Sequence, residues 1–233
     1  MKIALFGYGK MGQMIERVAL GRNHEITAKI DIDTTEIDFS NIDVAIDFSM
    51  PGAAFGNITK CIENNVPIIS GTTGWLDDYD KAVRICKEKK GAFIYASNFS
   101  LGVNLFFELN AKLARMMHPQ KQYNVSLEEI HHTQKLDAPS GTAITLAEGI
   151  LENSDYNGWK LDTEEPDYIP IRSKRIGDTP GTHTTQYQSK VDSIEIKHTA
   201  HNREGFAEGA VIAAEWIIGK TGIFTMQDVL NLG

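Results

Sequence analysis

The residue types best suited to chemistry are gathered in one stretch, His131 to Ala143, which reads HHTQKLDAPSGTA. Two imidazoles stand at its start, followed by the ammonium group of Lys135 and the carboxylate of Asp137. Histidine titrates near neutral pH and is a common proton donor, and a nearby lysine can hold an anion. These residue types predict an active site in which His131 or His132 supplies a proton beside a bound anion.

The elements around this stretch would place it at the start of a helix. Apolar residues indicate a short strand before it and a helix after it: Val125, Leu127 and Ile130, then Ile144, Leu146, Ala147 and Ile150. Ser140 is a typical N-cap residue, and Pro139 disfavours helical geometry at the residue before it. The free N–H groups of Gly141 and Thr142, with the Ser140 hydroxyl and the helix dipole, therefore predict a site for an anion such as a carboxylate.

Two other interpretations of His131 and His132 are a solvent-facing loop pair and a metal site. Adjacent side chains of a strand point to opposite faces, and no cysteine or HxxxH pattern accompanies the pair, so we predict no metal. His183 and His198 lie on two further expected strands and are interpreted as sheet residues or as supports behind the site.

A second set of candidate residues lies at the N-terminus, where the apolar run 2–6 leads into GYGKMG at 7–12. A helical pattern follows, then a strand over 25–30 that ends at Asp31. This order is typical of dinucleotide binding, although a merely structural glycine turn is the alternative. The predicted cofactor residues of this part are Gly7, Gly9, Lys10, Met11 and Gly12 and, for the adenosine ribose, Asp31.

Strands and helices then alternate as far as Tyr95, which indicates a parallel sheet covered by helices on both faces. Strands are expected at 44–48, 67–70 and 92–95, and helices at 53–63 and 76–89. Ligands of such sheets bind beyond the carboxyl ends of the strands. The turns at that edge add Phe48, Gly71, Thr72, Thr73, Ser97, Asn98 and Phe99 to the predicted cofactor residues.

After a long apolar helix expected over 102–117, the pattern changes. Strands are expected over 171–175, 182–189 and 193–199, whereas 153–170 is polar and rich in turns, without a clear period. A helix over 206–218 and a capped turn over 225–230 close the chain. The sequence therefore predicts an α/β protein, with a Rossmann dinucleotide-binding domain and an α+β domain built on a mixed sheet.

Composition narrows the class of partner. The 23 basic and 31 acidic residues give a net charge of −8, which argues against nucleic acid. No apolar run approaches a membrane span, and no signal peptide precedes the first strand. Only Cys61 and Cys86 occur, far apart in the sequence, so we expect a cytoplasmic globular protein.

The segment from Glu129 to Ala143 closely resembles the signature of the dihydrodipicolinate (4-hydroxy-tetrahydrodipicolinate) reductase family of lysine and diaminopimelate synthesis. Similar segments recur in the same order along nearly the whole chain: GKMG at 9–12, DFS at 47–49, GTTG at 71–74, SNFSLGVN at 97–104, RIG at 175–177, GTH at 181–183, HTA at 198–200 and 203–210. Several independent motifs in one order make a chance similarity improbable.

This resemblance implies a Rossmann domain over 1–102 and 206–233 that binds NADH or NADPH. It also implies a substrate-binding and oligomerisation domain over 103–205, whose sheets form a homotetramer. The expected reaction is hydride transfer from the nicotinamide to a small dicarboxylate substrate, 4-hydroxy-tetrahydrodipicolinate, with loss of water, to give tetrahydrodipicolinate.

The resemblance also assigns roles within the stretch. His131 is the expected proton donor, and Lys135 is expected to hold a substrate carboxylate and to assist protonation. Ser140, Gly141 and Thr142 would bind that same carboxylate, and His132 would orient the ring. Asp137 is expected to order the loop, since a free carboxylate would repel a dicarboxylate.

Two departures from the family pattern concern the cofactor. Phe6 stands where the longer GxxGxxG loop has its first glycine, and Ile32 follows Asp31 where a basic residue often stands. Without that cation a 2′-phosphate has less support, so we expect NADH to be used at least as well as NADPH.

Two rival functions are another nicotinamide oxidoreductase, such as an amino-acid or aldehyde dehydrogenase, and a nucleotide sensor without chemistry. The first would need a cysteine nucleophile or a different base, and neither Cys61 nor Cys86 lies in a predicted site loop. A sensor has no need of a proton donor beside an anion site. The sequence therefore favours the reductase.

Overall fold

The computed structural model describes residues 1–34 and 36–232, which divide into two compact units. Unit 1 comprises residues 1–101 together with the chain from Glu204 onward, and unit 2 comprises Gly102–Arg203.

Unit 1 is built on a six-stranded sheet in the order β11-β5-β4-β3-β1-β2. All neighbouring strands are parallel. The strands are β1 (Lys2–Phe6), β2 (Glu25–Ile30), β3 (Val44–Asp47), β4 (Ile68–Ser70), β5 (Ala92–Tyr95) and β11 (Gly222–Phe224). β3 and β4 are buried throughout, as expected for central strands of a parallel sheet with both faces covered. The predicted Rossmann-type sheet is confirmed.

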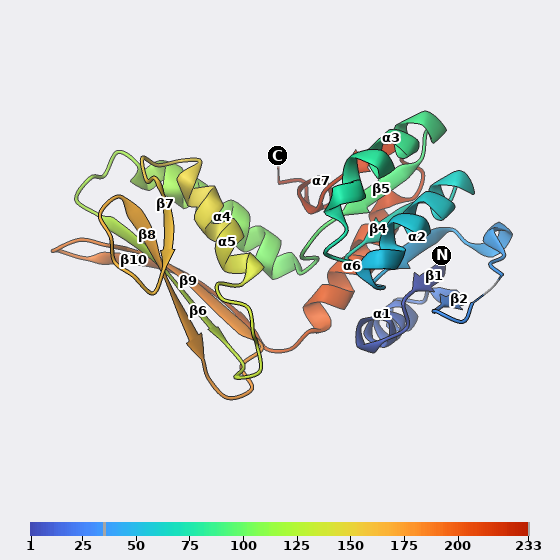
Figure 1. The fold of residues 1–233 in the computed structure, drawn as a ribbon, viewed down its shortest axis with the longest axis horizontal. Coiled ribbons are helices and arrows are strands. Elements are labelled where there is room, and N and C mark those ends of the chain that lie inside the picture. The colour runs from blue at the N-terminus through green and yellow to red at the C-terminus, as the bar shows by residue number, and fades with distance from the viewer. Residues whose placement is uncertain (35, 233) are drawn as a thin grey trace. The chain divides into compact units, whose positions relative to one another are not determined.

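Alternation along these strands divides the core of unit 1 between two helical layers. Ile3, Leu5 and Ile46 point toward one face, where they pack with α1 (Lys10–Gly21), α6 (Glu204–Ile217) and α7 (Met226–Leu230). Ala4 and Phe6 point toward the other, against α2 (Pro51–Glu63) and α3 (Tyr79–Lys89). Two short 3-10 turns, Phe39–Asn41 and Leu76–Asp78, complete the unit, and Figure 1 shows its sheet between these helices.

Unit 2 is a five-stranded mixed sheet in the order β10-β9-β6-β8-β7. The strands are β6 (Asn124–His131), β7 (Gly158–Leu161), β8 (Tyr168–Arg175), β9 (Gly181–Gln188) and β10 (Ser193–Ala200). β6 pairs antiparallel with β9 but parallel with β8, which confirms the mixed sheet predicted from the sequence.

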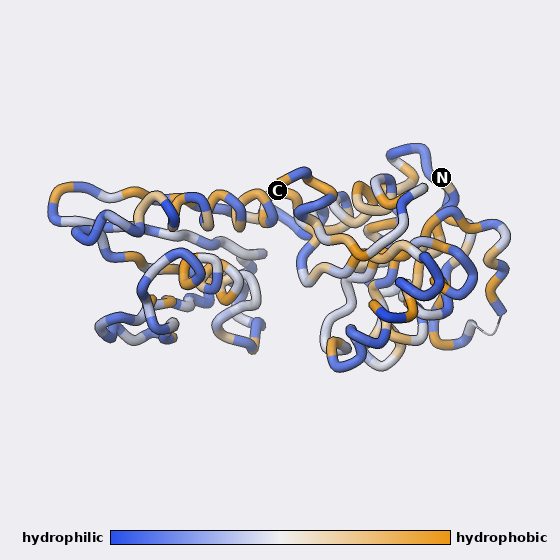
Figure 2. Tube along the Cα trace, turned by 90° about the horizontal axis from the view of Figure 1, so that it is seen from above, coloured by the Kyte–Doolittle hydropathy of each residue, from blue (hydrophilic) through white to orange (hydrophobic). Residues whose placement is uncertain are grey.

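Two helices supply the hydrophobic cover of this sheet. α4 (Leu101–Met117) and α5 (Gly141–Leu151) lie side by side, green and yellow in Figure 1, where the Asn110 amide donates to the Leu146 carbonyl at 2.9 Å. Orange and blue alternate along the helices in Figure 2, as amphipathic helices require. Phe106, Leu127 and Ile171 belong to the core between helices and sheet.

The sequence analysis missed two edge strands. β7 and the first residues of β8 fall inside 153–170, where no element was expected, and β11 is only three residues long. Every residue of β7 is half-buried, so neither alternation nor a continuous apolar run marks it. These segments are strands because a neighbouring strand offers them backbone hydrogen bonds, which no local pattern reveals.

Across the part of the chain that the structure describes, no helix combines the length and hydrophobicity that a transmembrane segment requires.

Candidate active site

The site in unit 2 is built around a residue that the sequence analysis left out, Glu129. Its side chain is fully buried, on the same face of β6 as His131, and His183 of β9 stands opposite it in register. Glu129 Oε2 lies 3.5 Å from His131 Nδ1 and 3.7 Å from His183 Nε2. The centroids of the two imidazoles are 5.0 Å apart. Two strands thus bring three titratable groups into one buried space.

Glu129 is also contacted by three further residues, one at the N-cap of α5 and two on β8. The Ser140 backbone N–H donates to Oε2 at 3.0 Å, and the Ser173 hydroxyl donates to Oε1 at 2.5 Å. Arg175 Nη1 lies 3.4 Å from Oε1. Burial alone would raise the pKa of Glu129, but the hydrogen bonds from His183, Ser140 and Ser173 outweigh it and hold the pKa well below its usual range. Glu129 is therefore a charged anchor for the surrounding loops.

His131 has the opposite perturbation. Burial lowers its pKa to about 4, with His183, Lys135 and Arg175 acting in the same direction and Glu129 against them. The imidazole is therefore neutral at neutral pH. Negative charge brought next to His131 would raise its pKa and favour the imidazolium.

Glu129, His131 and His183 each offer one ligand atom, and these atoms lie within 4.8 Å of one another, a spacing that a metal ion could bridge. The carboxylate, however, already accepts from Ser140 and Ser173 and lies beside the Arg175 guanidinium. That guanidinium supplies the positive charge that a metal would bring. The contacts therefore favour proton transfer over metal binding at this cluster.

The anion site expected at the start of α5 has the predicted N-cap. Ser140 Oγ accepts from the Ala143 N–H at 3.3 Å and lies 3.1 Å from His183 Nε2. Both the hydroxyl and the N–H of Ser140 are thus engaged within the protein, and the residue is buried. Gly141 and Thr142 occupy the first two helical positions, where no intrahelical carbonyl can accept from the N–H groups. These two N–H groups are the ones left to hold a ligand.

Lys135 and Asp137 form an ion pair in the loop between His131 and α5. Lys135 Nζ lies 2.7 Å from each carboxylate oxygen of Asp137, and this contact holds the pKa of Asp137 below its usual range. Arg175 fastens the same loop, because it donates to the carbonyls of Lys135 at 3.2 Å and Asp137 at 2.6 Å. Asp137 therefore orders the loop, and a ligand carboxylate must compete with it for Lys135. His132 is half-buried, and its carbonyl accepts from the Lys135 N–H at 3.1 Å.

In the glycine-rich turn of unit 1, Gly7, Gly9 and Gly12 each lack a side chain for a different structural reason. Gly7 has a φ of +87°, and a Cβ there would lie 2.3 Å from the Phe48 carbonyl oxygen. A Cβ on Gly12 would lie 2.3 Å from the Gly7 carbonyl oxygen. Gly9, in contrast, has an ordinary φ of −77° and open space within 4 Å of its missing Cβ. Gly7 and Gly12 permit the turn itself, whereas Gly9 leaves room at the N-terminus of α1 for a ligand phosphate.

At the carboxyl end of β2, Asp31 is exposed and receives the N–H of Ile32 at 2.9 Å. Ile32 is 88% exposed and contributes no charge. The nearest lysine along the strand, Lys29, is bonded to Glu16 at 2.7 Å and to the Tyr8 hydroxyl at 2.9 Å. The position predicted to bind the adenosine ribose therefore has a carboxylate, while the neighbouring cation, Lys29, is already paired.

The remaining predicted cofactor residues lie in the turns that follow β3, β4 and β5. The Phe48 ring packs on Gly71, where a Cβ would lie 2.3 Å from it, and on Phe99 with 5.8 Å between centroids. Thr72 is buried, and Thr73 and Ser97 are exposed. Asn98 Oδ1 accepts from the Ser100 N–H at 2.9 Å. The Phe99 side chain belongs to the core and supports Phe48, so only its backbone is available to a cofactor.

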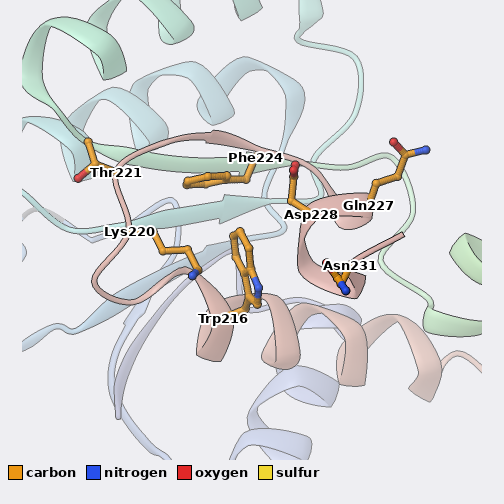
Figure 3. Close-up of a pocket in the computed structure, with 7 residues that line it drawn as sticks. All are labelled: Trp216, Lys220, Thr221, Phe224, Gln227, Asp228 and Asn231. Atoms are coloured by element: carbon orange, nitrogen blue, oxygen red, sulfur yellow. The ribbon is translucent and has the colours of Figure 1, made fainter. Parts of the chain in front are cut away.

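A surface hollow of about 570 Å³ in unit 1 lies outside both sets of predicted residues. Figure 3 shows Trp216 and Phe224 edge to face at its centre, 5.0 Å apart, with Lys220 beside the indole. Of the two ionisable residues in its lining, Lys220 lies over the Trp216 ring and Asp228 takes part in the capping box of α7.

Two residues at the centre of the unit 2 site were given no role from the sequence, Glu129 and Arg175, and a third, His183, was interpreted only as a sheet residue or a support behind the site. A signal did exist, because Glu129 and His131 are two apart on an expected strand and so share a face. Arg175 and His183 come from β8 and β9, and only the strand order brings them beside β6.

Unit 1 has a parallel sheet with open space at the N-terminus of α1, and unit 2 has a buried acid–base cluster beside the start of α5. Together these features define a two-domain oxidoreductase that binds a nicotinamide dinucleotide. Models of the families "Dihydrodipicolinate reductase, N-terminus" and "Dihydrodipicolinate reductase, C-terminus" match residues 1–99 and 102–230. The chain belongs to the dihydrodipicolinate reductase family.

Individual relatives agree with this assignment. The 4-hydroxy-tetrahydrodipicolinate reductase of Christiangramia forsetii is 61% identical over 99% of this chain and 98% of that protein. The enzyme of the same name from Neisseria gonorrhoeae is 39% identical over 92% and 81%. The fold is similar to that of the dipicolinate-bound dihydrodipicolinate reductase from Paenisporosarcina sp. TG-14, with a TM-score of 0.82, 24% identity and 98% of both chains covered.

Proposed function

We propose that this protein reduces 4-hydroxy-tetrahydrodipicolinate to tetrahydrodipicolinate with a hydride from NADH or NADPH, in lysine and diaminopimelate synthesis. Unit 1 is the dinucleotide-binding domain and unit 2 the substrate-binding and oligomerisation domain of a cytoplasmic homotetramer. The observation that carries the proposal is the buried Glu129–His131–His183 cluster beside the start of α5. Membership of the family supports the same activity.

His131 is the proposed proton donor. Hydride arrival leaves negative charge on the conjugated imine system of the substrate, and that charge needs a proton. Because burial lowers the pKa of His131 to about 4, the imidazolium forms only when the dianionic substrate is bound against it. Glu129, whose Oε2 lies 3.5 Å from His131 Nδ1, supplies the negative charge that stabilises this protonated state.

Substrate carboxylates are held by the loop and the helix start. Gly141 and Thr142 offer backbone N–H groups, and Ser140 holds the first turn in place through its contacts with Ala143 and Glu129. When the substrate binds, Lys135 releases its ion pair with Asp137 and pairs with the substrate carboxylate instead. It also assists protonation of the substrate. His132 orients the ring.

The dinucleotide lies along the carboxyl edge of the unit 1 sheet. The glycine-rich turn and the start of α1 receive the pyrophosphate, Asp31 the adenosine ribose, and the turns after β3, β4 and β5 the nicotinamide half. The proposed cofactor residues are Gly7, Gly9, Lys10, Met11, Gly12, Asp31, Phe48, Gly71, Thr72, Thr73, Ser97, Asn98 and Phe99. NADH is used at least as well as NADPH, because Ile32 provides no cation for a 2′-phosphate and Lys29 is engaged by Glu16.

The test is oxidation of NADH and NADPH, followed by absorbance, with substrate made in place from pyruvate and aspartate semialdehyde by the synthase. We expect rapid oxidation that depends on the synthase, and kcat/KM for NADH no lower than for NADPH. In Lys135→Ala turnover should be lost while NADH affinity is unchanged, because Lys135 belongs to unit 2. Cofactor binding without any oxidation would favour the sensor, and full turnover by Lys135→Ala would refute the assigned site.

A further inference from the structure

A second buried carboxylate, Asp47, lies at the carboxyl end of β3 in unit 1, immediately before Phe48. Its side chain is fully buried and, among residues 1–34 and 36–232, has no ion-pair partner, but four polar side chains donate to it. Oδ1 accepts from the Ser49 hydroxyl at 2.6 Å and the Asn57 amide at 2.9 Å. Oδ2 accepts from the hydroxyls of Ser70 at 2.8 Å and Thr72 at 2.7 Å. Each oxygen thus has two donors, which compensates the cost of burying the group.

These donors belong to the two turns that carry the proposed nicotinamide contacts. Ser49 follows β3, and Thr72 follows β4. The Ser49 N–H donates to Thr72 Oγ1 at 2.9 Å, so the turns are joined directly as well as through Asp47. The Gly71 N–H donates to the Asp47 carbonyl at 2.9 Å, which sets the distance at which Gly71 meets the Phe48 ring.

We propose that Asp47 is a positioning residue that holds the turns after β3 and β4 in the arrangement that receives the nicotinamide half of the dinucleotide. This inference rests on the proposed function, because it assumes that those turns contact that half of the cofactor. Asp47 itself is covered by its donors and acts through Phe48, Gly71 and Thr72.

A carboxylate is needed because it accepts on both oxygens. The hydroxyls of Ser49, Ser70 and Thr72 all direct their protons to Asp47, which leaves their lone pairs free to accept from other groups. An asparagine would present one NH₂ group to two of the four donors. Those donors would have to turn away or lose a partner, and the hydroxyl orientations in both turns would change.

The test compares two ligands that share the adenosine and pyrophosphate part but differ in the nicotinamide. Wild-type protein and Asp47→Asn are titrated with NADH and with ADP-ribose. We expect NADH to bind Asp47→Asn at least tenfold more weakly while ADP-ribose binding changes by less than twofold. KM for NADH should rise more than kcat falls. Ser70→Ala, which removes one donor and leaves the carboxylate, should show the same pattern at smaller size.

Asp43→Asn is the matched control, because Asp43 is the residue just before β3 and is exposed, and within the described part of the chain its side chain accepts only the backbone N–H of Lys2, at 2.7 Å. It should leave both affinities unchanged. Equal weakening of both ligands in Asp47→Asn and Ser70→Ala would show that the carboxylate only stabilises the fold, and unchanged NADH binding would overturn the inference. If Asp47→Asn fails to fold, the Ser70→Ala comparison decides. Failure of the proposed function would instead appear in the wild type, as absence of NADH binding.

Discussion

Replacing Glu129 by Gln tests the acid–base arrangement most directly. The substitution keeps the size and shape of the side chain but removes the charge that faces His131 at 3.5 Å. Two charges at this separation interact by about 5 kcal/mol at an effective dielectric constant of about 20, which is an upper limit for the stabilisation that Glu129 gives the imidazolium. Arg175 would lose its counter-charge at the same time, and its positive charge also disfavours protonation of His131.

Because each 1.36 kcal/mol is tenfold in rate, we expect kcat to fall by roughly 100- to 1,000-fold, somewhat less than the upper limit implies. The protein should also lose about 2–4 kcal/mol of stability, since a partly buried cation is left without its carboxylate. The three backbone carbonyls to which Arg175 donates moderate this loss.

Turnover is measured in the synthase-coupled assay, with thermal unfolding and NADH titration on the same samples. Glu128→Gln is the control, because Glu128 is the preceding residue on β6 and pairs on the surface with Lys174 at 2.7 Å. It should change kcat by less than twofold. A Glu129→Gln protein that is folded, binds NADH normally and keeps kcat within threefold of the wild type would refute the role given to the Glu129–His131 pair.

Three further predictions concern stability and the cofactor. Since the pKa of His131 is lowered from 6.5 to about 4, the unfolded chain binds more protons between these values, so stability is present above pH 6.5 and is lost as the pH falls toward 4. In urea unfolding between pH 7 and pH 5 the wild type should lose about 2 kcal/mol more than His131→Asn, and equal losses would contradict the assigned shift. Gly9→Ala should change the free energy of unfolding by no more than about 1 kcal/mol but should bind NADH at least roughly tenfold more weakly. Gly12→Ala should lose about 1–3 kcal/mol of stability, because of these two residues only Gly12 would place its Cβ against backbone atoms. Ile32→Arg should raise the ratio of kcat/KM for NADPH to kcat/KM for NADH by roughly tenfold, because the guanidinium adds one charge-assisted contact next to Asp31. If this ratio is unchanged, the 2′-phosphate binds elsewhere.

Much of the fold follows from local patterns in the sequence. The strand–turn–helix order up to Tyr95 predicted the parallel sheet, because fully buried strands are short apolar runs and the intervening helices are amphipathic. Thr225 and Asp228 predicted the capping box of α7 in the same way, since that motif depends only on residues three apart. β7 and β11 could not be found by such reasoning, because a short edge strand owes its conformation to its neighbour.

In the candidate site, too, contacts within one loop could be predicted from the sequence, whereas contacts that depend on strand pairing could not. Ser140, Lys135 and Asp137 act within one loop, so their contacts could be anticipated from spacing and residue type. Glu129 meets His183 only because β6 and β9 pair in one particular register. His183, interpreted from the sequence as a sheet residue or a support behind the site, contacts both Ser140 and Glu129.

These contacts link recognition of the anion to supply of the proton. Ser140 caps α5, donates to Glu129 through its N–H and lies against His183 through its hydroxyl. An anion bound by the N–H groups of the first turn of α5 would therefore lie next to Ser140, the residue that contacts both Glu129 and His183. Its negative charge adds to that of Glu129 and opposes the burial that keeps His131 neutral. Under the proposed function, a histidine whose pKa is lowered by burial is suited to the reaction, because its proton would be taken up when the dianion binds and delivered when hydride transfer creates the charge that needs it.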